Sequence, residues 1–499
     1  MANEYLYGAY GKLGQTIARN AIQSGTVSVY VGTAPVNLVR GYKKHGIVNT
    51  PVKLMNLPNA QQTIGYSGDW KRFTLCEAVS AHFDNVLGNI GPIYVINVLD
   101  PDINRKMPED AVNISLVFSN GQAVIKSTTI ILDTLALEGL AEGYDYTVDY
   151  NYASGTAIIK SIGANRITGA VDASYLEVDF DGINADAIIG SVTANGEYSG
   201  LGALQLLYQE QYQICNLLMA PGWSHIPRVY NAMLTASEQI NGHWDAFVLA
   251  DIPLEAGENE EKVSIETISE AKAWKKQNGY NSERSKVFWP QGRDNIGKVY
   301  HLSTLAAVEF MRIDHTHASV PFETCGNKQI PVTRQYFGDA SPNKGFDQIT
   351  SKELTSNGIS TCVFWGGNWV LWGDHTAAYT YGADVDPRAI FDVSMRMLFH
   401  ITNSFQREWG TTIDEPFTKQ LRDRIINREQ EKLDTLVAQG ALIGNPSVLF
   451  LESNNSTEDM MNGDFRWDIP VTPTPPLKSA TVYVAYTEEG FSAYFDGEG

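Results

Sequence analysis

The chain has 499 residues and a formal net charge of −20 at pH 7, with 57 acidic and 37 basic residues. Its length predicts roughly two to four domains, because single hydrophobic cores stop growing well below this size. The acidic balance argues against direct nucleic-acid binding, which needs a basic face. No apolar run approaches the roughly 20 residues that cross a bilayer, and the first residues lack the basic and apolar regions of a signal peptide.

The four cysteines are Cys76, Cys215, Cys325 and Cys362. They are scattered and form no CxxC pair, so a zinc ribbon or a thioredoxin motif has no support. The pattern is typical of reduced cysteines in a cytosolic protein.

The N-terminal part shows no clear periodicity up to about residue 25. Residues 26–32 are rich in β-branched side chains and predict a strand. Apolar residues at helical spacing predict a helix over 70–88. The apolar run 93–99 predicts a second strand, which an Asp-Pro pair ends.

From about 104 to 182 the chain changes to short β segments with little helical signal. Apolar residues alternate over 112–118, and Asn120-Gly121 follows as a hairpin signal. Further short strands are predicted at 123–132, 145–150, 156–160 and 175–180. This pattern predicts a small β-sandwich.

From 183 to about 350, strands and helices alternate. Strands are predicted at 215–219, 244–249 and 285–289, and helices at 225–241, 265–277 and 301–313. Such alternation predicts an α/β layer with a mostly parallel sheet.

Two long helices are predicted next, the first over 387–409. The second starts at Asp414-Glu415-Pro416, with acids near the helix N-terminus and Pro in the first turn, and ends at Gly440. Its polar face carries five basic residues, Lys419, Arg422, Arg424, Arg428 and Lys432. In so acidic a chain this basic stripe is a candidate surface for an acidic partner. The alternative is a solvated face with i,i+4 ion pairs.

The last thirty residues combine a stiff spacer with a β-forming segment. Four prolines lie in the seven positions 470–476, which predicts an extended spacer. Residues 479–486 are apolar on both faces, with Val482, Val484 and Tyr486 on one and Tyr483 on the other. This predicts a strand buried on both sides, which can add to a sheet of its own subunit or of a neighbour.

No sequence motif argues for catalysis. The GxxxxGK[ST], GxSxG and HExxH patterns are absent, and no GxGxxG follows a strand. His315 and His317 could hold a metal if they lay on a strand, but no third ligand is specified. We therefore predict no enzyme, no catalytic residue, no cofactor and no metal.

The order of segments resembles the tail sheath proteins of contractile-tailed bacteriophages and phage-tail-like particles. The similar runs are TVSVYVGTAPV (26–36), YDYTVD (144–149), AIIG (187–190), APGWS (220–224), ADIP (250–253) and WGDHT (372–376). Asn454-Asn455 and Gly463 before a late strand resemble the closing module of that family. Asp374-His375 departs from the family, where Asn-Arg is common. The resemblance covers nearly the whole chain, except that the region before Thr26 has no matching motif.

The resemblance implies a mixed α+β and α/β multidomain chain. The sheath core is an α/β sheet with packed helices, built from N-terminal, middle and C-terminal parts. It carries an inserted small β-sandwich and extended N- and C-terminal arms. The implied segments are an N-terminal arm (1–25), an N-terminal core part (26–103), the β-sandwich (104–182), an α/β sheath domain (183–350), a C-terminal sheath domain with tube-facing helices (351–470), and a spacer with the arm strand (471–499).

The resemblance also implies a function. Such a subunit stacks helically around an inner tail tube, and contracts to drive the tube through a bacterial envelope. Implied partners are other copies of the chain, the tube protein, and baseplate and tail terminator proteins, with neither nucleic acid nor membrane insertion. The implied location is a virion tail or tail-like particle, assembled in the host cytoplasm. Arms would exchange strands between subunits, and linkers near 100–106, 181–186 and 470–478 would act as hinges.

Two alternatives remain at this stage. The first keeps the family and replaces the phage by a tailocin or another contractile injection system. The second is a metal-dependent enzyme or a glycan-binding protein, with His315 and His317 as ligands.

Overall fold

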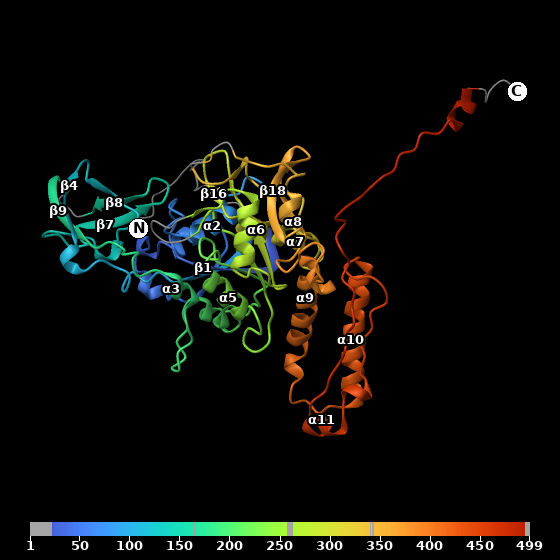
Figure 1. The fold of residues 1–499 in the computed structure, drawn as a ribbon. Helices are drawn as coiled ribbons and strands as arrows, with labels where there is room; N and C mark the ends of the chain where they lie inside the picture. The colour runs from blue at the N-terminus through green and yellow to red at the C-terminus, as the bar shows by residue number, and fades with distance from the viewer. Residues whose placement is uncertain (1–21, 163–165, 257–262, 340, 342–343, 495–499) are drawn as a thin grey trace, which may run out of the picture.

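The computed structural model describes residues 22–162, 166–256, 263–339, 341 and 344–494 (Figure 1). Residues 1–21 of the predicted N-terminal arm lie outside this range. No helix in the described part of the chain has both the length and the apolar character that a membrane crossing requires.

An eight-stranded sheet organises the body of the molecule, in the order β19-β18-β14-β11-β10-β1-β3-β2. The six strands from β18 to β3 run parallel, and the edge strands β19 and β2 are antiparallel. The strands are β1 (Ile22–Gly32), β2 (Pro51–Leu54), β3 (Ile90–Asn97), β10 (Leu217–Met219), β11 (Phe247–Asp251), β14 (Ser285–Phe288), β18 (Ile359–Trp365) and β19 (Asn368–Trp372). The mostly parallel sheet is thus confirmed, and it joins strands from the N-terminal, middle and C-terminal parts.

Helices cover both faces of this sheet, so its central strands are buried on both sides. One face packs against α1 (Leu57–Thr63), α2 (Leu75–Phe83) and α7 (Leu302–Thr316). The other packs against α3 (Ala185–Ile189), α4 (Leu206–Gln211), α5 (Pro227–Ala236), α6 (Ile268–Gln277) and α8 (Lys352–Thr355). In β1, Tyr30 points to the first cluster and Val29 and Val31 to the second, as the alternation of strand side chains requires.

The predicted strands and helices of 183–350 are confirmed as β10, α5, β11, α6, β14 and α7, with ends shifted by a few residues. The helix predicted over 70–88 was too long, because α2 spans only Leu75–Phe83. Asn85 ends it: its side-chain amide donates to the Ala81 carbonyl (2.9 Å), and its carbonyl oxygen accepts from the Leu87 N–H (2.9 Å).

Residues 112–175 form two three-stranded sheets that share one hydrophobic cluster. The first contains β4 (Val112–Phe118), β9 (Gly169–Tyr175) and β6 (Ala136–Leu137), and the second β5 (Gln122–Lys126), β8 (Thr156–Ser161) and β7 (Tyr146–Asn151). The predicted turn at Asn120-Gly121 is present, with both φ angles positive (54° and 74°) and a single bridge between Ser119 and Gln122. The predicted hairpin does not continue beyond it, because β4 and β5 belong to different sheets. The strand predicted at 175–180 was misplaced, because β9 ends at Tyr175 and residues 176–178 leave it to bond with 129–131.

Short two- and three-stranded ribbons complete the α/β body. They are β12 (Glu255–Ala256) with β13 (Val263–Ser264), and β15 (Gln291–Arg293) with β16 (Val299–Tyr300) and β17 (Arg334–Tyr336).

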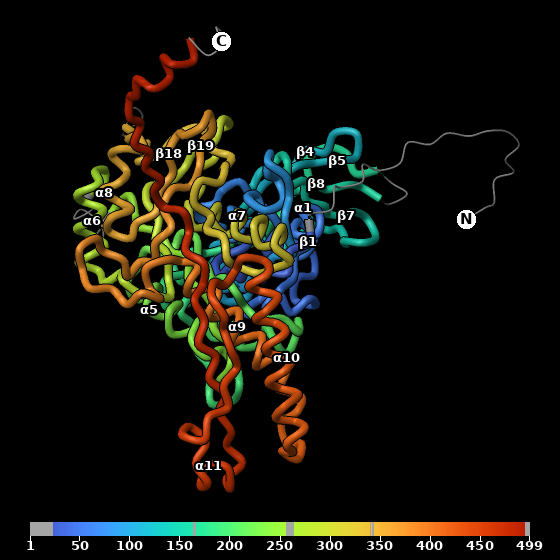
Figure 2. Tube along the Cα trace, turned by 90° about the vertical axis from the view of Figure 1, so that its right-hand side faces the viewer, coloured from blue at the N-terminus to red at the C-terminus, as the bar shows by residue number. Residues whose placement is uncertain are grey.

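The C-terminal helices α9 (Asp392–Trp409), α10 (Lys419–Ala438) and α11 (Thr457–Asn462) project from the body (Figures 1 and 2). The start predicted for the second helix at 414–416 was wrong. Asp414 has a left-handed φ of 69°, which breaks the helical path, and Thr418 caps α10 by accepting from the Leu421 N–H. The first helix starts at Asp392, because residues 387–389 form a separate turn and Phe391 is extended.

Candidate assembly surfaces

The C-terminal arm, defined here as residues 477–494, leaves the body as an extended segment and ends in a short 3-10 helix, Glu489–Tyr494 (Figures 1 and 2). Its apolar side chains face solvent: Val482 is 81% exposed, Tyr483 94%, Val484 90% and Tyr486 78%. The prediction of a strand buried on both sides is therefore wrong for the single chain. A strand needs a partner for its backbone groups, and within the described residues the arm meets no sheet edge of its own subunit.

The spacer before the arm is tied to the loop after α10. The Ile443 N–H donates to the Thr472 carbonyl (3.0 Å), and the Thr474 N–H donates to the Ala441 carbonyl (3.1 Å). Lys478 lies above the ring of Tyr379, with its Nζ 5.1 Å from the ring centre. The chain is thus anchored up to about Lys478 and free beyond it, which fixes where the arm departs.

The hairpin of β18 and β19 presents a second apolar surface. Phe364 and Trp365 at its tip are 58% and 50% exposed, next to a turn of Gly366 and Gly367 with positive φ angles. The sequence of residues 365–369 suggests a ligand platform, although aromatic residues beside glycines in a strand-turn-strand are more often packed within the fold. The aromatic residues beside the Gly-Gly turn are visible in the sequence, but the sequence alone does not show that the tip of the hairpin stays exposed.

The basic stripe of α10 is largely neutralised within the chain. Four of its five residues have carboxylate partners: Arg422 with Asp423 (2.6 Å), Arg424 with Glu415 (3.3 Å), Arg428 with Glu408 (2.9 Å) and Lys432 with Glu429 (2.7 Å). Among the described residues only Lys419 of the five has no carboxylate partner. Most of the stripe is thus paired within the single chain, but none of these four pairs has the i,i+4 spacing expected from the sequence.

Two buried ion pairs fasten the first turns of α9 to the body, one to β14 and one to α7. Lys286 of β14 and Asp392 are both fully buried, with Nζ 2.7 Å from Oδ2. Lys286 Nζ also donates to the carbonyls of Gly373 (2.9 Å) and His375 (3.4 Å). Burial would lower the pKa of Lys286, but the Asp392 carboxylate outweighs it and raises the pKa. The ammonium is thus charged and fully bonded.

The second pair joins Arg396, one turn further along α9, to Asp314 at the end of α7. The Thr26 hydroxyl of β1 also donates to Asp314, at 2.7 Å. Because both pairs anchor the same end of α9, this helix is tied to the body at its base, and its far end extends from it.

His315 and His317 do not lie on a strand, contrary to the geometry that a metal site would need. They lie at the end of α7, where His315 is exposed and His317 Nε2 is 2.6 Å from the Glu323 carboxylate. In the ranges that the structure describes, no group of three or more His, Cys, Asp or Glu residues could hold a metal ion.

Open parallel sheets usually bind ligands at the carboxyl ends of their strands. Here that edge holds a buried polar network. Glu77 accepts from the His301 N–H (2.7 Å) and contacts its Nδ1 (2.7 Å). Asp251, at the end of β11, accepts from the Ser303 N–H (3.1 Å). Burial raises the pKa of Asp251. These groups bond to one another, an arrangement that stabilises the fold.

Sequence comparison finds tail sheath proteins over most of the chain. The chain is 25% identical to the tail sheath protein of Burkholderia phage BcepMu, over 98% of both chains. It is 22% identical to the major tail sheath protein of Serratia phage KSP20, over 69% of this chain and 81% of that protein. No family model matches. The resemblance predicted from the sequence is thereby confirmed.

Solved structures share the fold. A chain of the anti-feeding prophage baseplate aligns over 97% of this chain and 99% of its own, with a TM-score of 0.55 and 12% identity. The contracted helical sheath of the same particle aligns with a TM-score of 0.54, at 14% identity and over the same shares of both chains. A contracted PVC sheath complex gives 0.52 at 12% identity, over 98% of this chain and 99% of that chain.

Proposed function

We propose that this chain is the structural subunit of a contractile tail sheath, which polymerises helically around an inner tube and contracts to drive it through a bacterial envelope. The observation that carries this function is the end-to-end similarity to a phage tail sheath protein, over 98% of both chains. The shared fold with contracted sheaths supports it. The similar proteins are structural, so the proposed role requires no catalysis.

The proposed subunit has six segments. They are an N-terminal arm (1–25), an N-terminal core part (26–103), an inserted β-sandwich (104–182), an α/β sheath domain (183–350), a C-terminal sheath domain (351–470) and the spacer with the arm strand (471–499). The two small sheets share a hydrophobic cluster to which Leu38 is the one described contributor from outside 112–175, which supports an inserted β-sandwich.

We propose that the arm residues Val482, Tyr483, Val484 and Tyr486 complete a sheet of a neighbouring subunit. Their exposure supports this, because an apolar β-forming segment of this length is costly to leave in water. The anchored spacer sets the direction in which the arm leaves the body.

We propose that α10 faces the inner tube through Lys419, Arg422, Arg424, Arg428 and Lys432. Since four of these residues already hold carboxylates, Lys419 is the residue most available to a new partner. Arg422, Arg424 and Arg428 can exchange partners at the surface at little cost, because exposed ion pairs are worth at most about 1 kcal/mol. Lys432 is less available, because its partner Glu429 is buried.

The other proposed partners are further copies of this chain and the baseplate and tail terminator proteins, with neither nucleic acid nor membrane insertion. Assembly would take place in the host cytoplasm. A tailocin or another contractile injection system remains the alternative particle, and neighbouring capsid and packaging genes would distinguish a phage from it.

Negative-stain electron microscopy of the full-length chain at high concentration tests the function. We expect regular hollow tubes with a helical repeat. If only small particles form, the candidate tube protein is added. Small particles in its presence as well would contradict the proposal.

Reversal of Lys419, Arg422 and Arg428 to Glu tests the tube-facing surface. We expect weaker co-assembly with the tube protein and an unchanged circular dichroism spectrum. A matched control reverses Lys126, an exposed residue of β5, to Glu. Equal co-assembly of both variants would exclude the basic stripe as the tube contact.

A further inference from the structure

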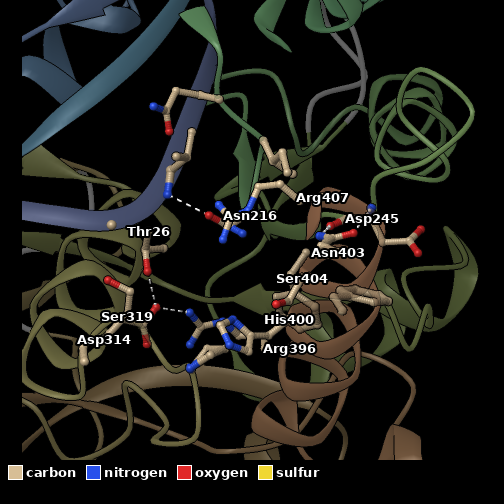
Figure 3. Close-up of a pocket in the computed structure, with 18 residues that line it drawn as sticks. Thr26, Asn216, Asp245, Asp314, Ser319, Arg396, His400, Asn403, Ser404 and Arg407 are labelled. Atoms are coloured by element: carbon tan, nitrogen blue, oxygen red, sulfur yellow. Dashed lines mark hydrogen bonds and ion pairs between the residues drawn. The ribbon is translucent and has the colours of Figure 1, made fainter. Parts of the chain in front are cut away.

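A pocket of about 290 Å³ lies at the amino-terminal edge of the central sheet (Figure 3). The starts of β1, β10 and β11 line one side, and α9 lines the other. The pocket and the network of His301 and Asp251 therefore lie at opposite ends of the sheet strands.

One face of α9 supplies the nitrogen-bearing side chains of the pocket. Arg396, His400 and Arg407 are separated by four and seven positions, so they share a helix face. Arg396 is only 4% exposed; its Nη2 donates to Asp314, whereas its Nη1 has no partner. Arg407 lies at the exposed rim and has no ion pair or hydrogen bond within the described residues.

The two acidic residues of the pocket do not neutralise Arg407. Asp314 holds Arg396 and the Thr26 hydroxyl, and Asp245 holds Arg284 at 2.6 Å. Burial, with the charges of Arg407 and Arg396, lowers the pKa of His400 to about 4. The pocket therefore has an uncompensated positive charge in a chain of net charge −20.

We propose that this pocket binds a carboxylate group, which an acidic side chain of a second copy of this chain supplies in the assembled particle. The guanidinium of Arg407 offers a planar pair of donors that matches a carboxylate. The hydroxyls of Ser404 and Ser319 line the same space and can donate to the same anion.

A second copy fits as the source of the carboxylate because packing of strongly acidic subunits brings like charges together. Placing a carboxylate of one subunit beside an unpaired cation of the next offsets part of this repulsion. The source of the carboxylate rests on the proposed sheath assembly, whereas the anion site itself does not.

The anion site is tested on the unassembled full-length chain by titration with acetate against chloride at equal ionic strength. We expect saturable binding by calorimetry and a matching rise in the unfolding temperature. Arg407→Gln should weaken acetate binding about tenfold, the effect of one lost charge-assisted hydrogen bond. Lys126→Gln, which removes an exposed cation far along the chain from the pocket, should bind acetate as the unsubstituted chain does. No acetate binding, or equal binding by Arg407→Gln, would overturn the site.

Tube formation then identifies the source. A second-copy carboxylate predicts fewer tubes for Arg407→Gln and inhibition of the unsubstituted chain by saturating acetate. Normal tubes in both experiments would assign the site to a free carboxylate anion and refute the second-copy source. Because acetate binding is measured without tubes, loss of the site and failure of the sheath function are separable.

Discussion

The central sheet and the C-terminal arm have similar β-forming residues but opposite environments. Every residue of β11 is buried, whereas Val482, Tyr483, Val484 and Tyr486 of the arm are among the most exposed apolar side chains described. The sheet strands find neighbours within the chain, and the arm finds none in its described part. A local pattern thus specifies the preference for a strand, but the partner depends on the rest of the chain or on another chain.

Deletion of 477–499 should separate the two regions most completely. We expect the body to fold with its unfolding midpoint nearly unchanged, because the described residues of the deleted segment, 477–494, are exposed. Tube formation should be abolished, since the proposed strand exchange loses its strand. The measurements are thermal unfolding and negative-stain microscopy of the same sample.

A point variant separates the loss of the apolar face of the arm from the mere shortening of the chain. Val484→Asp keeps the length of the arm but puts a charge on its apolar face, and it should also prevent tubes. Tubes of normal geometry from either variant would show that the arm is not the exchanged strand.

Local periodicity accounts for the part of the fold that sequence predicts well. The strands and helices of 183–350 and the turn at Asn120-Gly121 follow from apolar spacing and from positive-φ residues. Helix ends were less predictable. Asp414 fitted a helix start by composition, but its left-handed backbone turns the chain before α10 begins.

Contacts between distant residues account for what sequence did not predict. Lys286 and Asp392 are 106 positions apart, and a Lys within a strand pattern reads as a solvent-facing residue. The pocket of Arg396 and Arg407 depends on three strand starts that meet only in the folded sheet. Of the predicted assembly residues, the arm was identified by its composition, whereas the partners of the basic stripe required the geometry of α9 and α10.

Lys286→Met tests how strongly the stability of the buried central sheet depends on its polar contacts. Among the described residues, the variant leaves the buried Asp392 carboxylate with the Thr324 hydroxyl (2.9 Å) as its remaining side-chain hydrogen-bond partner. We expect a loss of about 3–5 kcal/mol in the free energy of unfolding. Denaturant unfolding measures it. Asp392→Leu in the same chain should restore much of the loss, since the uncompensated charge is then removed.

The matched control is Lys272→Met. Lys272 pairs with Glu353 at the surface, with side chains 32% and 62% exposed, and its loss should cost at most about 1 kcal/mol. Similar losses for the two lysine variants would mean that the Lys286 pair is no more important than an exposed one.

His301 gives a smaller predicted effect than Lys286, and the direction of its pH dependence follows from its contacts. Burial alone would lower the pKa of His301, but the Glu77 carboxylate at 2.7 Å outweighs burial and raises the pKa to about 9. A folded pKa above the unfolded value of about 6.5 means that the imidazolium stabilises the fold fully below pH 6.5. This contribution is lost as the pH rises through 9. The unsubstituted chain should therefore lose on the order of 2 kcal/mol more than His301→Gln between pH 6.5 and 9.5. Denaturant unfolding of both proteins across this pH range isolates the contribution of His301 to the free energy of unfolding, because groups other than His301 titrate in both proteins. A constant difference between the two proteins would show that the Glu77 carboxylate does not stabilise the protonated form of His301.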